Sequence, residues 1–386
     1  MIALADAEWL NPLIGLLQEG QLLLLRSLAW LGLAGSSHGQ PAWPWASRLS
    51  GENLLIDLGQ ARRLALSLVV VALALLSLMA ALAWKRRRWL FVAAVPLLLV
   101  LAPWPDSGVV LVPASPTSFH RSPTGFGAEA IGRGRALYAQ HCVGCHGVDG
   151  RGQGTLAAAL PVWPPNLSGP LLWRRADGDI LWRVLHGTQD RHGASTMPAF
   201  GGLSDADAWA LIDFMKAQGA GQSLRANGVW SQPIGLPRAM VRCAGREPRP
   251  LSAWQGQRLR IVTTGPDSGW LEDPRMVTMQ LRPSSGEATQ DAADCVIDSP
   301  AAWEAFALIA GTDSLAGTQL LADRDGWLRA RSAPGAAGWS EDDLLCRTAP
   351  APGTVPAAGP SADGLGALVV RMDAEPVRFL KGGFIH

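Results

Sequence analysis

The hydrophobic pattern sets an apolar N-terminal part apart from a mixed remainder. Residues 64–84 form an apolar run in which Ser67 and Ser77 are the polar interruptions. A helix needs about 20 apolar residues to cross a bilayer, so this run predicts a transmembrane helix. A second apolar run, 89–104, contains Pro96 and is marginal in length for a second span.

Four consecutive basic residues, 85–88, separate the two apolar runs. Basic residues favour the cytoplasmic side of a membrane. The pattern therefore predicts a transmembrane helical hairpin over 61–105, with its turn in the cytoplasm and both ends outside. The alternative is a buried hairpin in a soluble protein, which would remove four adjacent cations from water.

The N-terminal region, 1–60, contains a leucine-rich stretch at 9–33 that carries Glu19 and Arg26. Charged side chains are costly in the middle of a bilayer. We therefore expect an amphipathic, interfacial helix on the membrane surface here, and a third membrane span is the alternative.

Two segments beyond the hairpin have distinct signals, one of a linker and one of a helix. Residues 106–127 are rich in Pro, Ser, Thr and Gly, which predicts a linker. Farther on, Ser204 followed by Asp207 forms a candidate capping box, and apolar residues then recur at helical spacing.

The C-terminal region, 228–386, combines strand and helix patterns. Residues 257–264 alternate as a strand does, 301–308 predict a helix, and 319–329 predict a hairpin with Asp-Gly at its turn. This order indicates an α/β domain.

Composition limits the function classes. The 386 residues are 48% hydrophobic and 17% charged, which fits two or three folded units with a membrane segment. The formal net charge is +1, and a nucleic-acid binder would need a concentrated basic face. We expect membrane lipid as a partner and no nucleic acid.

The string Cys142-Val-Gly-Cys145-His146 is the attachment pattern for c-type haem. The two thiols form thioethers to the haem vinyl groups, and the histidine ligates the iron. A zinc site would need a second Cys/His pair at ligand spacing, and none follows. A thioredoxin-type dithiol is the other alternative.

Three further cysteines, Cys243, Cys295 and Cys346, leave their pairing open. If they lie in an oxidising compartment, one disulfide and one remaining thiol are expected, and buried free cysteines are the alternative.

Residues 128–220 resemble class I cytochromes c. The resemblance rests on the haem string, on Gly134 and Tyr138 in the helix leading into it, and on three further segments: the glycine-rich loop 147–154, the Pro-Asn-Leu loop 165–167 and the middle helix 179–187. It implies an all-α cytochrome c domain with one covalent haem c, attached on the outer face of the bacterial cytoplasmic membrane. We also expect Phe214 to meet Tyr138 where the terminal helices cross.

The segment Thr196-Met197-Pro198 matches the family's Met-Pro loop, which implies Met197 as the second axial ligand beside His146. A core methionine is the alternative for Met197. His186 and His192 are rivals for the same coordination position. We expect His141 to be exposed or hydrogen-bonded.

The stretch with Gly317-Thr318 ahead of the hairpin weakly resembles the last half of a thioredoxin-like domain. However, 264–268 stands where the Cys-x-x-Cys pair should follow the first strand, so disulfide exchange by a dithiol cannot run. We expect a degenerate domain that binds a partner or packs. The chain end, 382–386, could bind copper through its histidine, and a frayed tail is the alternative.

The expected protein is thus multidomain: a transmembrane hairpin, a cytochrome c domain and a degenerate thioredoxin-like α/β domain. The leading hypothesis is a periplasmic one-electron carrier that serves redox partner proteins. A haem enzyme or sensor with a labile Met197 is the second, although Arg191 and His192 are the only distal candidates. In the third, the haem delivers electrons to a thiol or copper held by the C-terminal domain.

Overall fold

A computed structural model describes residues 9–51, 53–54, 57–169, 172–173, 175–263, 272–283, 293–334, 336, 338–346, 364–380 and 383–385. These residues form two compact units, one built mainly from Met1–Phe119 and the other from His120–Phe379. Each unit is described by itself. A short strand pair, β14 (Arg378–Leu380) and β15 (Gly383–Ile385), lies near the end of the chain.

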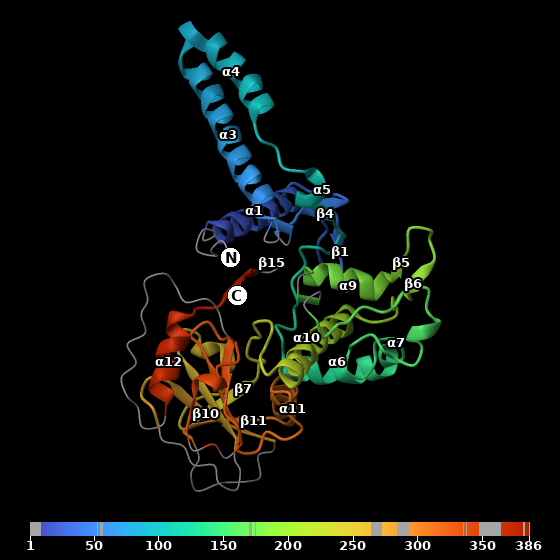
Figure 1. The fold of residues 1–386 in the computed structure, drawn as a ribbon, viewed down its shortest axis with the longest axis vertical. Coiled ribbons are helices and arrows are strands. Elements are labelled where there is room, and N and C mark those ends of the chain that lie inside the picture. The colour runs from blue at the N-terminus through green and yellow to red at the C-terminus, as the bar shows by residue number, and fades with distance from the viewer. Residues whose placement is uncertain are drawn as a thin grey trace. The chain divides into compact units, whose positions relative to one another are not determined.

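Two antiparallel helices dominate the first unit (Figure 1). They are α3 (Leu58–Ala83) and α4 (Arg88–Leu101), and a short 3-10 turn, η2 (Lys85–Arg87), connects them. The 26 residues of α3 span about 39 Å, and among the described residues α3 is the helix with the length and composition to cross a membrane. Ser77 Oγ donates to the Phe91 carbonyl at 2.9 Å and ties the two helices together.

Helix α4 is shorter than the apolar run that predicts it. Its 14 residues span about 21 Å and include Pro96. The chain leaves the helix at Ala102, and the indole of Trp104 donates to the Leu99 carbonyl at 2.9 Å. Pro103 and Pro105 have no backbone N–H, so this extended stretch presents few unpaired donors.

The base of the first unit is a small core where α1 (Leu10–Trp30) meets the start of α3. The core comprises Leu10, Ile14, Leu54, Ala61, Leu64 and Val110. The first part of the expected linker is ordered here as α5 (Ser107–Val110) and β4 (Leu111–Pro113), and β4 pairs with β3 (Ser47–Leu49). A second pair joins β1 (Ser36–Ser37) and β2 (Gln40–Pro41).

The second unit begins with a helical part. Its elements are α6 (Ala128–His141), α7 (Val143–His146), η3 (Ala157–Ala159), α9 (Asp177–His186), the pair β5 (Thr188–Gln189) and β6 (Ser195–Met197), and α10 (Asp205–Asn227). The expected cap is confirmed, because Ser204 Oγ accepts from the Asp207 backbone N–H at 3.1 Å. The expected aromatic contact is also confirmed, since the rings of Tyr138 and Phe214 lie 5.1 Å apart.

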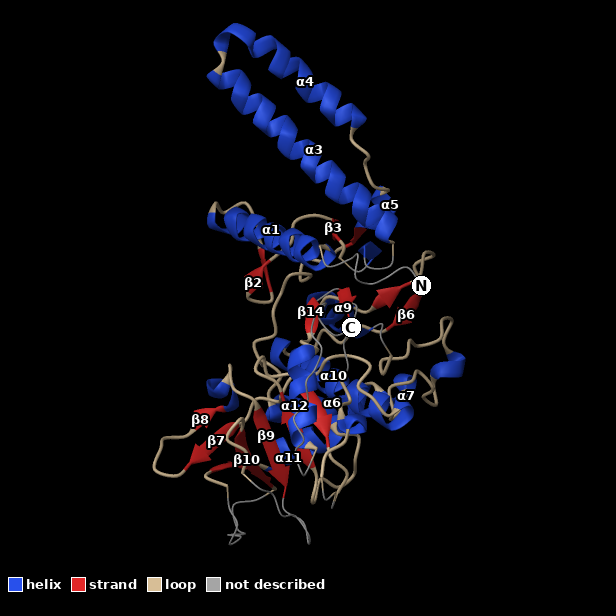
Figure 2. Cartoon of the chain, turned by 60° about the vertical axis from the view of Figure 1, so that its left-hand side comes forward, coloured by secondary structure: helices blue, strands red, loops and turns tan. Residues whose placement is uncertain are grey.

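A mixed sheet of seven strands forms the other part of this unit (Figure 2). In spatial order the strands are β13 (Leu328–Arg331), β12 (Gln319–Ala322), β9 (Leu259–Thr263), β10 (Val277–Arg282), β11 (Cys295–Asp298), β7 (Met240–Cys243) and β8 (Arg249–Pro250). The central strands β9, β10 and β11 are parallel and the others antiparallel. The accompanying helical elements are η4 (Leu251–Trp254), α11 (Pro300–Ile309), η5 (Glu341–Asp343) and α12 (Leu365–Ala374).

The helical part and the sheet part are joined by direct backbone contact. A Cβ added at Gly221 of α10 would lie 1.9 Å from the Leu308 carbonyl of α11. Arg225 Nε donates to the Gly311 carbonyl at 2.9 Å, and the Trp230 indole donates to the Ile309 carbonyl at 2.9 Å. Helix α10 therefore belongs to both parts.

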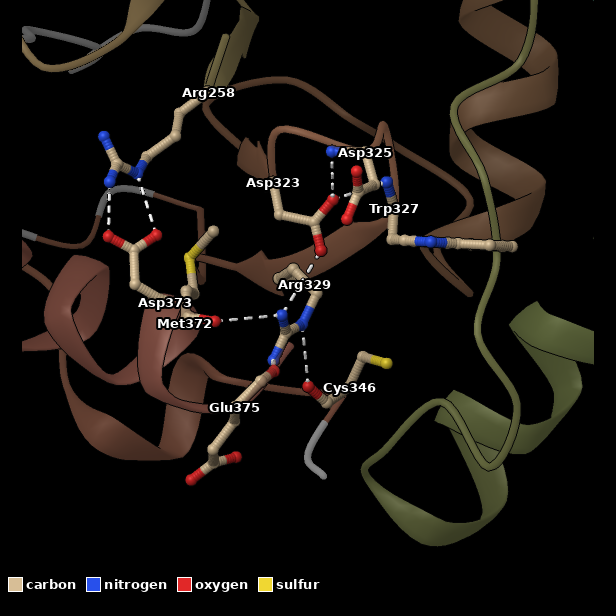
Figure 3. Close-up of polar contacts among 9 residues, drawn as sticks. All are labelled: Arg258, Asp323, Asp325, Trp327, Arg329, Cys346, Met372, Asp373 and Glu375. Atoms are coloured by element: carbon tan, nitrogen blue, oxygen red, sulfur yellow. Dashed lines mark hydrogen bonds and ion pairs between the residues drawn. The ribbon is translucent and has the colours of Figure 1, made fainter. Parts of the chain in front are cut away.

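The polar centre of the sheet part is the guanidinium of Arg329, which is completely buried (Figure 3). It donates to the carbonyls of Cys346 (3.1 Å), Met372 (3.2 Å) and Glu375 (2.7 Å), and to the Asp323 carboxylate (3.3 Å). These bonds connect the β12–β13 hairpin to the segment at Cys346 and to the end of α12.

Candidate functional site

The two haem-string cysteines and the following histidine lie on one helical turn. The Cys142 backbone N–H donates to the Tyr138 carbonyl at 2.9 Å, which ends α6. The Cys142 carbonyl then accepts from the His146 backbone N–H at 2.9 Å, which forms α7. Cys142 and Cys145 are half-buried and not bonded to each other. Two neighbouring thiols and an imidazole are thus presented together, as covalent haem attachment requires.

His146 is suited to bind a metal as a neutral imidazole. Its side chain is buried, and burial lowers its pKa. The Pro165 carbonyl opposes this effect on the pKa. The Nδ1 atom is enclosed, with no hydrogen-bond partner among the described residues. The unprotonated form is the one that ligates iron.

The Cys142 thiol differs from that of a reactive dithiol. Burial, and secondly the neighbouring Cys145, raise the pKa of Cys142 to about 11. Thioredoxin-type cysteines have lowered pKa values, because their thiolate is the nucleophile. The thioredoxin alternative for this string is therefore disfavoured.

The glycine-rich loop folds back directly over α7. Gly152 N–H donates to the His146 carbonyl at 2.8 Å, and Gly154 N–H donates to the Cys145 carbonyl at 3.1 Å. A Cβ at Gly154 would lie 2.3 Å from the Gly144 carbonyl, so a larger residue has no room. The buried Tyr138 hydroxyl donates to the Gly147 carbonyl at 2.9 Å. The loop therefore fixes the segment that carries both thiols.

Met197 ends β6, where it pairs with Thr188 of β5. The hydroxyls of Thr188 and Thr196 lie 2.8 Å apart. Gly187 has φ +71°, and a Cβ there would lie 2.5 Å from the Met197 carbonyl. Backbone contacts that glycine alone permits therefore determine the position of the Met-Pro loop.

The structure brings the Met-Pro loop close to the cysteine segment. The rings of His141 and Phe200 lie 5.8 Å apart, so the end of α6 contacts the loop three residues after Met197. Helix α7 and strand β6 lie on the same side of the helical part in both views (Figures 1 and 2).

The rival histidines have other surroundings. His186 is exposed and stacks on Trp182 with ring centres 3.6 Å apart. His192 is exposed in the turn between β5 and β6, where the Asp190 carboxylate accepts from its backbone N–H at 2.8 Å. Neither histidine is buried as His146 is.

Sequence reasoning left the cysteine pairing open, and the structure resolves it. Cys243 of β7 and Cys295 of β11 are directly opposed and disulfide-bonded, and Cys346 is a buried free thiol. A cross-strand pair cannot be read from one sequence, because the strands come together only in the folded sheet.

Among the described residues, no three His, Cys, Asp or Glu side chains gather as a metal site. Residues 264–268, where a thioredoxin dithiol would stand, lie outside the described residues, and so do Gly382 and His386 of the chain end.

Comparisons with known proteins identify part of the chain. Residues 129–215 match the family described as cytochrome C oxidase, cbb3-type, subunit III. No curated protein matches. Among solved structures, the Kuenenia stuttgartiensis reducing HAO-like protein complex Kustc0457/Kustc0458 is 22% identical. That alignment covers 33% of this chain and 59% of the other, and its TM-score of 0.23 is too low to support an argument.

The family match coincides with the helices that carry the Cys-x-x-Cys-His string and the Met-Pro loop. Such a domain implies covalently bound haem c, and its chemistry is haem-based electron transfer. The chain therefore contains a helical cytochrome c domain.

Proposed function

We propose that the protein is a membrane-anchored one-electron carrier with a single haem c. Cys142 and Cys145 hold the haem through thioethers, and His146 and Met197 are the axial ligands. The observation that carries this proposal is the pairing of a buried His146 with a Met-Pro loop that the His141–Phe200 contact brings to the same end of the domain.

The haem, when bound, supplies a reversible one-electron change at iron. The protein tunes that change. The Met197 thioether is soft and uncharged, so it favours ferrous iron and raises the reduction potential. With both axial positions filled by side chains, external ligands are excluded.

The anchor is the α3–α4 pair. The turn between these helices carries the four basic residues 85–88, which favour the cytoplasmic side. Both ends of the pair then lie outside, and the cytochrome domain follows on the periplasmic side of the bacterial cytoplasmic membrane. Covalent haem attachment on that side agrees with this orientation.

The C-terminal domain acts in this proposal as a docked, non-catalytic partner of the cytochrome. Its contact with α10 through α11 is a close backbone approach, since a Cβ at Gly221 would lie 1.9 Å from the Leu308 carbonyl. Its free thiol among the described residues, Cys346, is buried, and burial raises the pKa of that thiol to about 11. Such a thiol is a poor nucleophile, and as reduced sulfur it accepts no electrons.

A haem enzyme or sensor would need an open iron position. Arg191 and His192, the distal candidates from the sequence, are exposed in the β5–β6 turn, and no described contact directs them toward α7. We therefore favour the electron carrier.

The test is the spectrum of the full chain, expressed with the haem-attachment machinery and recorded in ferric and ferrous states with and without carbon monoxide. We expect a low-spin haem with a methionine-sulfur charge-transfer band and no response to carbon monoxide, and a carbon monoxide-binding haem in the Met197→Ala variant. A native haem that is high-spin or binds carbon monoxide would overturn the proposal in favour of the enzyme or sensor.

A further inference from the structure

Helix α1 has an apolar face that the rest of its unit leaves uncovered. Leu16, Leu23 and Trp30 recur every seven residues, about two helical turns, and are 65%, 66% and 86% exposed. Leu24 and Leu31, at 45% and 58%, widen this stripe. Gly20 and the exposed Ser27 lie between these side chains, and Ser27 Oγ donates to the Leu23 carbonyl at 2.9 Å. A group of exposed large apolar side chains on one helix face marks an interaction surface.

The opposite face of α1 is already occupied. Leu10 and Ile14 are buried in the core that α1 shares with the start of α3, and Gln21 and Leu25 continue the buried face. Gln21 is held there because its amide oxygen accepts from the Leu49 backbone N–H at 2.8 Å. The outward stripe therefore cannot turn inward without breaking this core.

The shared core fixes α1 at a definite level of α3. Its α3 members, Ala61 and Leu64, flank the point where the exposed Arg62 and Arg63 give way to the apolar run. In Figure 1 α1 runs across this end of α3. Basic residues at the end of an apolar helix mark the boundary of the bilayer.

We propose that α1 is an in-plane helix seated in the outer interface of the membrane, with the Leu16–Leu23–Trp30 stripe inserted at the headgroup–acyl boundary. The proposal rests on the membrane span proposed for α3. A helix that crosses the span at its polar end must lie in the plane of the interface, where one apolar and one charged side are favoured.

The charges of α1 fit this placement. Glu19 and Arg26 are exposed and also lie seven residues apart, so they form a separate stripe on one edge of the apolar face. That edge remains in the headgroup region while the leucines enter the apolar layer. A spanning α1 would carry both charges through the hydrocarbon.

The test uses the full chain in nanodiscs of phosphatidylethanolamine and phosphatidylglycerol, with one nitroxide label per variant. The labelled positions are Leu16→Cys, Leu23→Cys and Trp30→Cys, with Glu19→Cys on the charged edge and Leu75→Cys in α3 as controls. Cys243 and Cys295 are bonded, Cys346 is buried, and Cys142 and Cys145 are taken up in the thioethers of the proposed haem, so the unsubstituted, haem-loaded chain measures a low background. Collision rates with oxygen and with a water-soluble nickel chelate give the depth of each label.

We expect the three stripe positions to favour oxygen over nickel to the same extent, at a shallower depth than Leu75→Cys, and Glu19→Cys to favour nickel. A depth that changes steadily from 16 to 30 would show a spanning helix and overturn the proposal. High nickel access at all three positions, or low access to both reagents as in a protein contact with a second copy, would also overturn it. Nickel access at Leu75→Cys would instead refute the membrane span itself.

Discussion

Arg329 shows how a single buried side chain connects distant parts of the sheet domain (Figure 3). Its guanidinium donates hydrogen bonds to three buried backbone carbonyls, at Cys346, Met372 and Glu375. An unpaired buried carbonyl costs about 1–3 kcal/mol. The residue therefore contributes through the groups that it satisfies, more than through its charge.

We expect Arg329→Met to lower the free energy of unfolding by about 3–5 kcal/mol, because it leaves these carbonyls without this donor and removes the Arg329 hydrogen bond to Asp323 Oδ2. The matched control is Arg324→Met at an exposed position of the same hairpin, which should stay within about 0.5 kcal/mol. Urea unfolding of the full chain in detergent measures both. Equal effects of the two variants would contradict this role.

Asp323 gives a pH dependence of known sign. Burial raises the pKa of its carboxyl, and this outweighs the Trp327 backbone N–H and the Arg329 charge, which act in the other direction. The folded protein therefore binds the proton more tightly than the unfolded chain does, so this group's contribution to stability rises as pH falls from neutral through the raised pKa. Relative to Asp323→Asn, which cannot titrate, the native chain should gain stability over that range in urea unfolding curves. A stability difference between the native chain and Asp323→Asn that does not change with pH would refute this prediction.

Gly187 controls the backbone that carries Met197. We expect Gly187→Ala to displace the Met-Pro loop, because its Cβ would lie 2.5 Å from the Met197 carbonyl, and to weaken or abolish the methionine-sulfur charge-transfer band. Gly193→Ala is the control: Gly193 has a similar φ of +81°, but nothing lies within 4 Å of its Cβ. That variant should lose about 1 kcal/mol to backbone strain and keep the band. A band unchanged in Gly187→Ala would contradict the role.

At the scale of elements, the crossing of α6 and α10 depends on one glycine. A Cβ at Gly134 would lie 2.0 Å from the Ala210 carbonyl, whereas a Cβ at Gly132, two residues earlier in α6, meets nothing within 4 Å. We expect Gly134→Ala to destabilise the cytochrome domain by about 2–3 kcal/mol through overpacking. Gly132→Ala should be neutral or stabilise by up to about 1 kcal/mol, because alanine favours the helix. Thermal unfolding followed by circular dichroism compares them.

Elements with strong local signals could be predicted from the sequence. The hairpin at 319–329 was predicted from its Asp-Gly turn, and β12 and β13 confirm it. The helix at 301–308 is confirmed as α11, and the mixed sheet confirms the α/β prediction. Strands β7 and β10 were not predicted, because their pairing depends on strands far away in the chain.

Helix ends were predicted less well than helix centres. Helix α10 continues to Asn227, and its last turns contact the end of α11, where Arg225 Nε donates to the Gly311 carbonyl. Helix α4 ends at Leu101, because Pro103 cannot continue it. Tertiary contacts and prolines decide these ends.

The arrangement of the haem string could be predicted from the sequence, because its two cysteines and its histidine are neighbours in the chain. The string 142–146 fixes two thiols and a histidine on one turn by spacing alone. The supports of Met197 were not predicted: Thr188 and Thr196 have no special pattern in the sequence, and their hydroxyls meet only when β5 and β6 pair. The cysteine pair Cys243–Cys295 was hidden for the same reason.

For the whole molecule, the sidedness of the proposed anchor is testable. Alkaline phosphatase is active only outside the cytoplasm, and we expect activity when it is fused after Phe119 and none when it is fused within 85–88. The reason is the positive charge of that turn, which favours the cytoplasm. Activity from the second fusion alone would reverse the proposed orientation and place the haem domain in the cytoplasm.

Because α10 belongs to both the helical part and the sheet part, it limits where the chain can be divided. The family match ends at residue 215, in the middle of this helix, and the second half of α10 carries the contact with α11. A chain cut at the end of the match would lose the second half of the helix, including Gly221, and with it the contact with α11. A fragment that keeps all of α10 but lacks the sheet would instead expose the face at Gly221, so the last helix of the cytochrome part depends on the sheet part of the same unit.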